Sequence, residues 1–510
     1  MPFKVKVINA VIWVIFVTIG FLISLPNHYN FRTYALDLGY SLQVIDFHAQ
    51  GGLIPPPLSS SSISPSPTAK LQMVLPHFSP VFFLAVPFYK IGGAWGVLTF
   101  QVLCFGVAAI GVFAYAWVRL REPWAATLVH GHFWGMWGIT SALGFDFHEI
   151  VVGIMGLPFV WLGLETRRYG IAYLGWVIFI AAKENLALWG VWIALVLCFF
   201  YVEAERRKRL LAMALGATLW FVGGHFLYKV PEGVAIEASR TAGLYGYLAA
   251  SDPVAAANGQ APQPGFSYLG VLRTFLTKPQ LVWSLLFESP LDDGRYRFIK
   301  SELYWTLLWS GGWSFLFAPL YFALLFPVIL YKTLAVDPLQ WGILAQYSVE
   351  FVCILPFAVL HVAERWRGRK AFWVALGSGA MGAHLVNIFI MQDTYSVWLH
   401  KEQLLWYRCD HYSSEYNYAC VHEGLSLIPR GASVAATSRL LPYIPARPRY
   451  YLWPTGGAQA DYIALLQKDP NPWPMSSQEL QRDILALQRS QAWEKIWDRC
   501  NLVIFRRRQR

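Results

Sequence analysis

The stretch IAYLGWVIFIAAKENLALWGVWIALVLCFFY, residues 171–201, decides how this chain is organised, because it is apolar on both sides of a charged centre. Lys183, Glu184 and Asn185 form that centre. A charged side chain near the middle of a membrane helix costs about 2.5–3.5 kcal/mol on insertion scales. Such residues are kept where they face one another, a cavity or a ligand. The stretch therefore predicts a membrane protein with a polar working site.

Basic residues flank this stretch at both ends, at Arg167–Arg168 and at Arg206–Arg209. Because Lys and Arg gather in cytoplasmic loops, both ends are expected on the cytoplasmic side. The chain must then turn back near Lys183. A helix over residues 171–182 would rise only about 18 Å, against about 30 Å of hydrocarbon. The turn is therefore expected below the outer surface, where irregular backbone lines a cavity.

The composition excludes several classes of protein. The 510 residues are 56% hydrophobic and only 14% charged, which is too apolar for a soluble protein of this length. The net charge of +11 could indicate nucleic acid binding. The basic residues lie in short runs between apolar segments, however, so we interpret them as topology markers and expect contact with membrane lipids and no nucleic acid.

The apolar segments predict a polytopic α-helical membrane protein with about 11 transmembrane helices. Its membrane module is expected over residues 1–391, with outside loops at 27–92 and 229–302. The N-terminus is expected in the cytoplasm. The expected crossings are residues 8–25, 94–118, 124–143, 150–164, 171–201 (two crossings), 210–228, 304–310, 313–331, 343–360 and 371–391.

From residue 392 the composition is that of a soluble domain, so residues 392–510 are expected to form a small extracytoplasmic α/β domain. The expected strands and helices alternate along this segment. A capping box, Ser476 to Glu479, predicts a helix that ends near Arg489. A disulfide between Cys409 and Cys420 is one interpretation, since both cysteines fall on the expected outside face. The expected strands are 433–437, 450–453, 462–465 and 501–505, with a short helix at 439–444.

Short polar motifs follow one another in a defined order along the chain. They are Asp37-Leu38-Gly39, His77-Phe78-Ser79-Pro80, Phe145-Asp146-Phe147-His148-Glu149, Lys183-Glu184-Asn185, Gln346-Tyr347-Ser348, and in the tail Ser433–Arg439, Arg447-Pro448 and Ala460-Asp461-Tyr462. In this order, most of the chain resembles the bacterial membrane family known as domain of unknown function 2079. That family in turn is similar to the GT-C class of integral-membrane glycosyltransferases.

The resemblance implies a GT-C-like fold in a bacterial inner (cell) membrane, with the C-terminal domain in the periplasm. It implies transfer of a sugar from a polyprenyl-phosphate carrier to an acceptor on the periplasmic side. The chain departs from the family pattern at Asn185, where Asp is usual, and at Gln346, where His is frequent. Two alternatives therefore stay open: a non-catalytic subunit or scaffold within a membrane complex, derived from such an enzyme, and a lipid or sugar transporter.

Asp37 is the candidate catalytic base, since the resemblance places the catalytic acid just after the first span. Its alternative role is to cap the helix that begins at Leu38. His77 is a candidate ligand for phosphate or metal, and the alternative is a hydrogen bond at a helix start.

Asp146, His148 and Glu149 form a second candidate cluster, in which Asp146 and His148 have the spacing of a loop-borne pair of metal ligands. A divalent metal ion is one option there, and an interfacial polar cluster is the other. Lys183 and Glu184 are expected to form an ion pair with Asp146 or His148, or Lys183 meets the leaving phosphate.

Tyr347 is a candidate sugar contact or an interfacial anchor. All of these candidates are expected to converge in one pocket on the outside.

Overall fold

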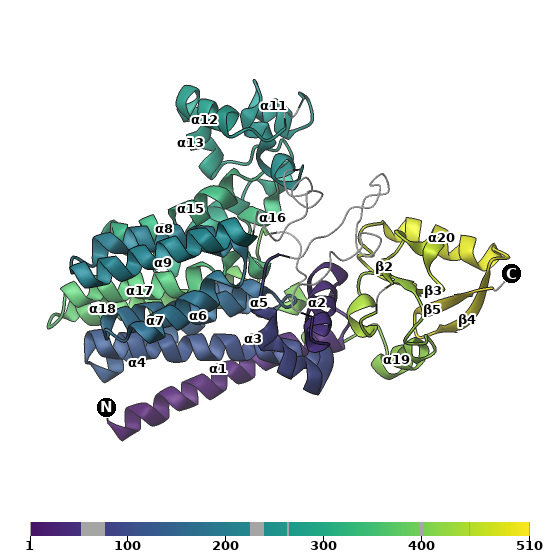
Figure 1. Ribbon diagram of the computed structural model, residues 1–510, viewed down its shortest axis with the longest axis horizontal. Helices are drawn as coiled ribbons and strands as arrows, with labels where there is room; N and C mark the ends of the chain where they lie inside the picture. Colours follow the sequence, from purple (N-terminus) through teal and green to yellow (C-terminus); the bar gives the residue numbers. More distant parts are fainter. Residues whose placement is uncertain are drawn as a thin grey trace. The chain divides into compact units, whose positions relative to one another are not determined.

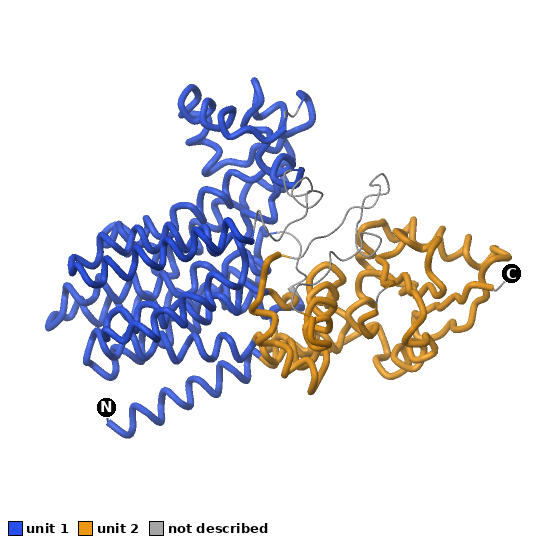
Figure 2. The backbone as a smooth tube through the Cα atoms, in the orientation of Figure 1, with its two compact units in different colours: residues 1–20, 102–144, 149–405 blue, residues 21–101, 145–148, 406–510 orange. Residues whose placement is uncertain are grey.

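A computed structural model describes residues 2–52, 77–224, 239–262, 265–396, 401–447 and 449–508. Parts of both expected outside loops, residues 53–76 and 225–238, lie outside these ranges. The chain forms two compact units, each built from segments that are distant in sequence (Figure 2). Unit 1 contains residues 1–20, 102–144 and 149–405, and unit 2 contains residues 21–101, 145–148 and 406–510. The boundary expected near residue 391, between a membrane module and a C-terminal domain, stays a prediction.

Unit 1 is helical, as the apolar segments predict (Figure 1). Among the described residues, three helices are long and apolar enough to cross a membrane, or four if a bent pair, Pro338–Ser348 with Phe351–Arg365, is one span. The number of crossings expected from the sequence is therefore not confirmed. The helices that lie wholly in this unit include α4 (Pro123–Gly135), α5 (Trp137–Leu143), α6 (Glu149–Glu165), α7 (Tyr169–Ile180), α8 (Glu184–Phe200), α9 (Ala204–Val222), α15 (Pro319–Leu334), α16 (Pro338–Trp341), α17 (Phe351–Arg365) and α18 (Lys370–Leu385).

The turn expected near Lys183 is confirmed. Helix α7 ends at Ile180 and α8 begins at Glu184, with Lys183 in extended backbone at φ −164° and ψ 144°. Helices α6 and α7 pack closely, because Gly156 and Gly175 face each other and a Cβ on Gly156 would lie 2.3 Å from the Gly175 carbonyl oxygen. Small residues allow this close approach between membrane helices.

Two long helices, α1 and α3, each contribute residues to both units. Helix α1 covers Phe3–Tyr29 and α3 covers Phe82–Leu120. Gly93 interrupts α3 at φ 55° and ψ −132°, a conformation that residues with a Cβ rarely adopt. The break agrees with the expected start of a span at residue 94.

Residues 239–262 and 265–302 of unit 1 form a small helical subdomain on α15. Tyr247, Leu248, Val282, Leu285 and Leu334 share its buried core. Its elements are η3 (Gly246–Ala249), α11 (Pro253–Ala257), α12 (Tyr268–Thr277), α13 (Pro279–Phe287), η4 (Gly294–Tyr296) and the first residues of α14 (Ile299–Trp309). After α14 the chain turns at Gly311 and continues through η5 (Gly312–Leu316) into α15, which gives the expected pair of a short and a long helix.

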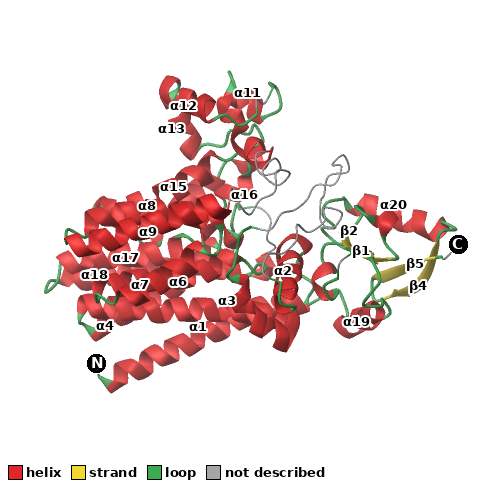
Figure 3. Cartoon of the chain, in the orientation of Figure 1, coloured by secondary structure: helices red, strands yellow, loops and turns green. Residues whose placement is uncertain are grey.

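Unit 2 contains a five-stranded sheet with the order β2-β1-β3-β5-β4 (Figure 3). Strand β1 is parallel to β2 and β3, whereas β5 is antiparallel to both β3 and β4. The strands are β1 (Val434–Ala436), β2 (Tyr450–Leu452), β3 (Tyr462–Leu466), β4 (Trp493–Arg499) and β5 (Leu502–Arg507). The four strands expected from the sequence correspond to β1, β2, β3 and β5. Strand β4, which is half-exposed and rich in charged residues, was not expected.

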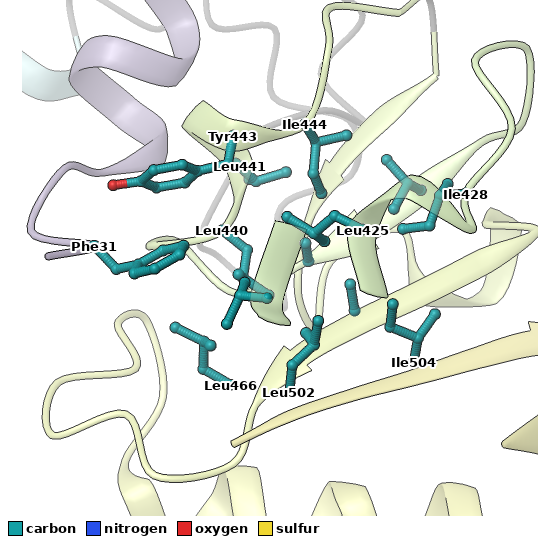
Figure 4. Packing of buried hydrophobic residues seen from close by; sticks show 14 of the residues in the cluster. Phe31, Leu425, Ile428, Leu440, Leu441, Tyr443, Ile444, Leu466, Leu502 and Ile504 are labelled. Atoms are coloured by element: carbon teal, nitrogen blue, oxygen red, sulfur yellow. The ribbon is translucent and has the colours of Figure 1, made fainter. Parts of the chain in front are cut away.

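Each face of the sheet is covered. Helix α20 (Ser477–Arg489), which begins with the expected capping box, packs on one face through Leu480, Ile484 and Leu487. The other face holds α19 (Tyr418–Ser426) and the short helix η10 (Leu441–Tyr443). Phe31 and Ala35, from the segment after α1, are buried in the same cluster (Figure 4). The sheet therefore shares its core with the segment that leads to Asp37.

The cysteine pairing expected from the sequence is wrong. Cys420 forms its disulfide with Cys500, and Cys409 is free and exposed. Cys420 lies on α19 and Cys500 lies between β4 and β5, so the pairing depends on α19 packing against these strands. Because β4 was not expected from the sequence, its partner helix could not be placed.

Replacing Cys420 and Cys500 together with Ser is expected to destabilise the sheet. The bridge closes a loop with a sequence separation of 80 residues. The chain-entropy treatment gives such a loop about 4.5 kcal/mol. Limited proteolysis of the full chain in urea, read at the C-terminal fragment, measures the loss. Cys409→Ser is the matched control and should leave the urea midpoint unchanged; an equal midpoint for both variants contradicts the assignment.

Candidate functional site

Asp37 lies on a tight turn between α1 and α2 (Tyr40–Ala49) in unit 2. Residues Ala35–Gly39 form η1, a π-helical turn, in which the Gly39 N–H donates to the Tyr34 carbonyl at 3.0 Å. Single π turns are rare in proteins, and many of those that occur lie at functional sites. The Asp37 side chain is 27% exposed, so its carboxylate is accessible to solvent.

His148 contacts Asp37 directly. Its Nε2 lies 3.1 Å from Asp37 Oδ1, and its Nδ1 lies 3.0 Å from the carbonyl oxygen of Asp146. A carbonyl oxygen only accepts hydrogen bonds, so Nδ1 carries a hydrogen. Nε2 is then the nitrogen that faces the Asp37 carboxylate. The pair brings a carboxylate and an imidazole within hydrogen-bond distance of each other.

Gln101 fixes the loop that carries His148. Its Oε1 accepts from the His148 backbone N–H at 2.8 Å, and its Nε2 donates to the Asp146 carbonyl at 3.1 Å. The Gln101 side chain is fully buried in α3. The ring of His148 also stacks on Phe145, with ring centroids 5.5 Å apart. The imidazole therefore has a single orientation.

Asp146 caps the turn that carries Asp37. Its Oδ2 accepts from the backbone N–H groups of Tyr34 at 2.7 Å and Leu38 at 3.2 Å, and the side chain is fully buried. Burial raises the pKa of Asp146 well above its usual value, and the charge of Asp37 raises it further. The two backbone hydrogen bonds act in the opposite direction on this pKa.

Residues from the sheet domain hold the same turn from the other side. The Ala35 N–H donates to Ser438 Oγ at 3.2 Å, and the Arg439 guanidinium lies 5.5 Å from the centre of the Tyr34 ring. Arg439 Nε lies 3.1 Å from Asp469 Oδ1 in a buried ion pair. The tail motif Ser433–Arg439 was the sequence signal for this contact, although no function was assigned to it.

A second polar cluster lies within unit 1. Lys183 Nζ lies 3.1 Å from Glu149 Oε1. This corrects the expectation that Lys183 pairs with Asp146 or His148; Glu149 is the next residue of the same motif. Glu184 is fully buried and begins α8.

The late motif belongs to this unit too. Lys332 donates to the Tyr347 carbonyl and lies 5.5 Å from the centre of the Tyr347 ring. Glu350, which accepts from the Tyr331 hydroxyl at 2.5 Å, interacts electrostatically with both Lys332 and Lys183.

The structure thus groups the candidates in two sets. Asp37, Asp146 and His148 come together in unit 2, where His77 lies half-buried just before α3. Glu149, Lys183, Glu184 and Tyr347 belong to unit 1. Convergence of all of them in one pocket stays a prediction, as do the individual roles of His77, Glu184 and Tyr347.

The metal option depends on which side-chain atoms of Asp146 and His148 are free to coordinate. Within the described ranges, no group of three or more His, Cys, Asp or Glu side chains could hold a metal ion. Asp146 Oδ2 and His148 Nδ1 both face backbone groups, so these two atoms are occupied.

The profile of a family described as "Predicted membrane protein (DUF2079)" matches residues 27–504. The chain belongs to this family. The match includes each of the motifs around Asp37, His148, Lys183, Tyr347 and Arg439. No curated protein sequence matches this DUF2079 protein.

Two solved structures are similar to this DUF2079 protein. The crystal structure of ArnT from Cupriavidus metallidurans bound to undecaprenyl phosphate matches with a TM-score of 0.50 and 11% identity, over 96% of this chain and 97% of that one. The apo state of the same protein matches with a TM-score of 0.43 and 11% identity, over 97% and 98%. The first match shows that the two proteins share a fold, in agreement with the expected GT-C resemblance.

Comparing Asp146→Asn with Asp146→Ala is expected to separate two contributions of Asp146: its hydrogen bonds to the turn and its negative charge. Asn is isosteric with the neutral acid and keeps an acceptor for Tyr34 and Leu38, whereas Ala removes it and costs about 1–3 kcal/mol. Because the pKa of Asp146 is raised in the folded state, the stability that the neutral acid contributes is fully present below pH 3.8, its usual pKa. This stability is lost as the pH rises through the folded-state pKa.

The thermal midpoint of Asp146→Asn should therefore gain on the wild type as the pH rises, and Asp146→Ala should stay below Asp146→Asn at every pH. Thermal unfolding measured in detergent across a pH series checks both. A constant difference between Asp146→Asn and the wild type would mean that Asp146 does not titrate as described.

The Lys183–Glu149 pair is expected to be coupled more strongly than a surface pair. Lys183→Met, Glu149→Gln and the double variant form a thermodynamic cycle, for which contacting groups give about 0.5–3 kcal/mol. Arg209 and Glu205, an exposed pair on α9 of the same unit, form the control cycle with about 0.3–0.5 kcal/mol. Unfolding in nanodiscs measures both cycles. Equal coupling in the two would show that Lys183 is merely solvated.

Proposed function

We propose that this protein is an integral-membrane glycosyltransferase that moves a sugar from a polyprenyl-phosphate carrier to an acceptor on the periplasmic side of a bacterial inner membrane. The Asp37–His148 pair is the observation that carries the proposal. It joins an accessible carboxylate to an imidazole of fixed orientation at 3.1 Å, just after the first membrane helix.

The shared fold supports the choice of carrier. ArnT, which matches over nearly its whole length, was crystallised with undecaprenyl phosphate bound. The Cys420–Cys500 disulfide supports the periplasmic side for the sheet domain, because disulfides persist in oxidising compartments. Asp37 lies in the same unit as this domain.

The proposed chemistry needs a base at the acceptor. The acceptor oxygen attacks the anomeric carbon of the sugar, and the bond from that carbon to the phosphate oxygen breaks. The electron pair leaves with the polyprenyl phosphate. The acceptor proton passes to the carboxylate oxygen of Asp37 that does not contact His148, and His148 holds the carboxylate in position through Nε2. His77, Glu149, Lys183, Glu184 and Tyr347 stay proposed substrate-binding residues.

Asp37→Asn is expected to reduce transfer by about 10²–10⁴-fold, since general base catalysis contributes that much. His148→Gln, which removes the imidazole that positions the carboxylate, should lower the rate less. The assay supplies a panel of undecaprenyl-phosphate-linked sugars to the protein in proteoliposomes, and mass spectrometry follows release of undecaprenyl phosphate.

Asp46→Asn is the matched control, because Asp46 lies on α2 of the same unit and bonds Tyr89 and Gln50. It should retain the wild-type rate. Full activity in Asp37→Asn would remove Asp37 from the mechanism. A wild-type protein that releases nothing, and that purifies only within a larger complex, would favour the non-catalytic scaffold suggested by Asn185 and Gln346.

A further inference from the structure

Helices α12 and α13 form a hairpin whose outward surface is apolar. Their inner side is an ordinary core, since Val282 and Leu285 pack with Tyr247 and Leu334. The hairpin contacts η3, α14 and α15 of unit 1 (Figure 1). The hairpin therefore has one face toward this core and one face away from it.

The outward face of α12 carries apolar side chains at successive helical turns. Tyr268, Leu272 and Leu276 are 82%, 53% and 73% exposed, and Leu269 beside them is exposed too. A helix on a water-soluble domain carries polar residues on this side and apolar residues only toward the core. On α12 apolar residues lie on the outward side as well as on the side where Val271 and Phe275 pack against the core, which indicates that a second apolar phase covers the outward side.

Helix α13 continues this surface. Trp283 is 66% exposed, and Phe287, one turn later, is exposed and lies 5.2 Å from it between ring centroids. Phe287 also lies 5.1 Å from the Tyr304 ring on α14. Trp305 and Trp309, further along α14, are exposed as well. The exposed apolar side chains thus extend from the hairpin, through the Phe287–Tyr304 contact, onto α14.

Polar residues border this surface on one side. Arg273 and Thr277 of α12 are exposed, and at 100° per residue they lie about 140° and 180° round the helix from Tyr268. A cation at the edge of an apolar face reaches lipid phosphates while its stem stays on the acyl chains. Trp and Tyr favour the same depth of the bilayer.

We propose that the α12–α13 hairpin lies in the plane of the membrane interface, with Tyr268, Leu272, Leu276 and Trp283 among the acyl chains and Arg273 at the headgroups. The occupant of the apolar face is lipid, because the face is continuous with helices of a membrane protein and has the Trp, Tyr and Arg pattern of interfacial helices. The proposal does not depend on the glycosyltransferase function.

Leu276→Cys and Thr277→Cys form the test pair, since both positions are exposed, they are adjacent, and they point about 100° apart. Each is labelled with a nitroxide in the full chain, in which Cys198 and Cys409 are replaced by Ser. The protein is placed in nanodiscs of phosphatidylcholine and phosphatidylglycerol. Collisions with oxygen, which concentrates in lipid, and with a water-soluble nickel chelate are then compared.

The label at 276 should show an oxygen-to-nickel accessibility ratio several-fold higher than the label at 277. Equally high accessibility to the nickel chelate at both positions would overturn the proposal, because the face would then be in water. Low accessibility to both reagents at 276 would also overturn it, since another protein surface, such as a second copy, would cover the face.

Discussion

The candidate site depends on Asp146, which holds both partners of the Asp37–His148 pair with different atoms. Its side-chain Oδ2 accepts from Tyr34 and Leu38 and so fixes the turn that carries Asp37. Its main-chain oxygen accepts from His148 Nδ1 and so fixes the tautomer of the imidazole. One buried residue therefore sets the 3.1 Å contact between Asp37 and His148. Burial keeps these hydrogen bonds away from water. A hydrogen bond in the low-dielectric interior is stronger than one at the surface.

The sheet domain is part of this arrangement. Phe31 and Ala35 belong to the same buried cluster as β1 and β5, and Ser438 and Arg439 contact the turn directly. The buried ion pair of Arg439 with Asp469 gives the guanidinium a fixed position over Tyr34. A buried pair of this kind contributes little net stability, but losing one partner is costly. Through these contacts, residues near both ends of the chain form one packing unit with Asp37.

Much of the helical organisation could be predicted from the sequence. Apolar length and basic flanks place the turn at Lys183, and the capping box places the start of α20, because these signals are local. Asp37 and His148 were both candidates through their motifs. The contributions of Gln101 and Ser438 were not foreseen, since each acts on residues more than 40 positions away. A single polar residue in an apolar span carries no local signal of its partner. The Cys420–Cys500 bridge and the Lys183–Glu149 pair depend on tertiary packing in the same way.

A structure of the full chain with an undecaprenyl-phosphate-linked sugar bound would show whether the sugar reaches Asp37. We expect the anomeric carbon beside Asp37, close enough for an acceptor oxygen to hydrogen-bond the carboxylate and attack that carbon, while His148 keeps its contact with Asp37. A carrier bound with its sugar away from Asp37, or an Asp37 that contacts only protein groups in that complex, would contradict it.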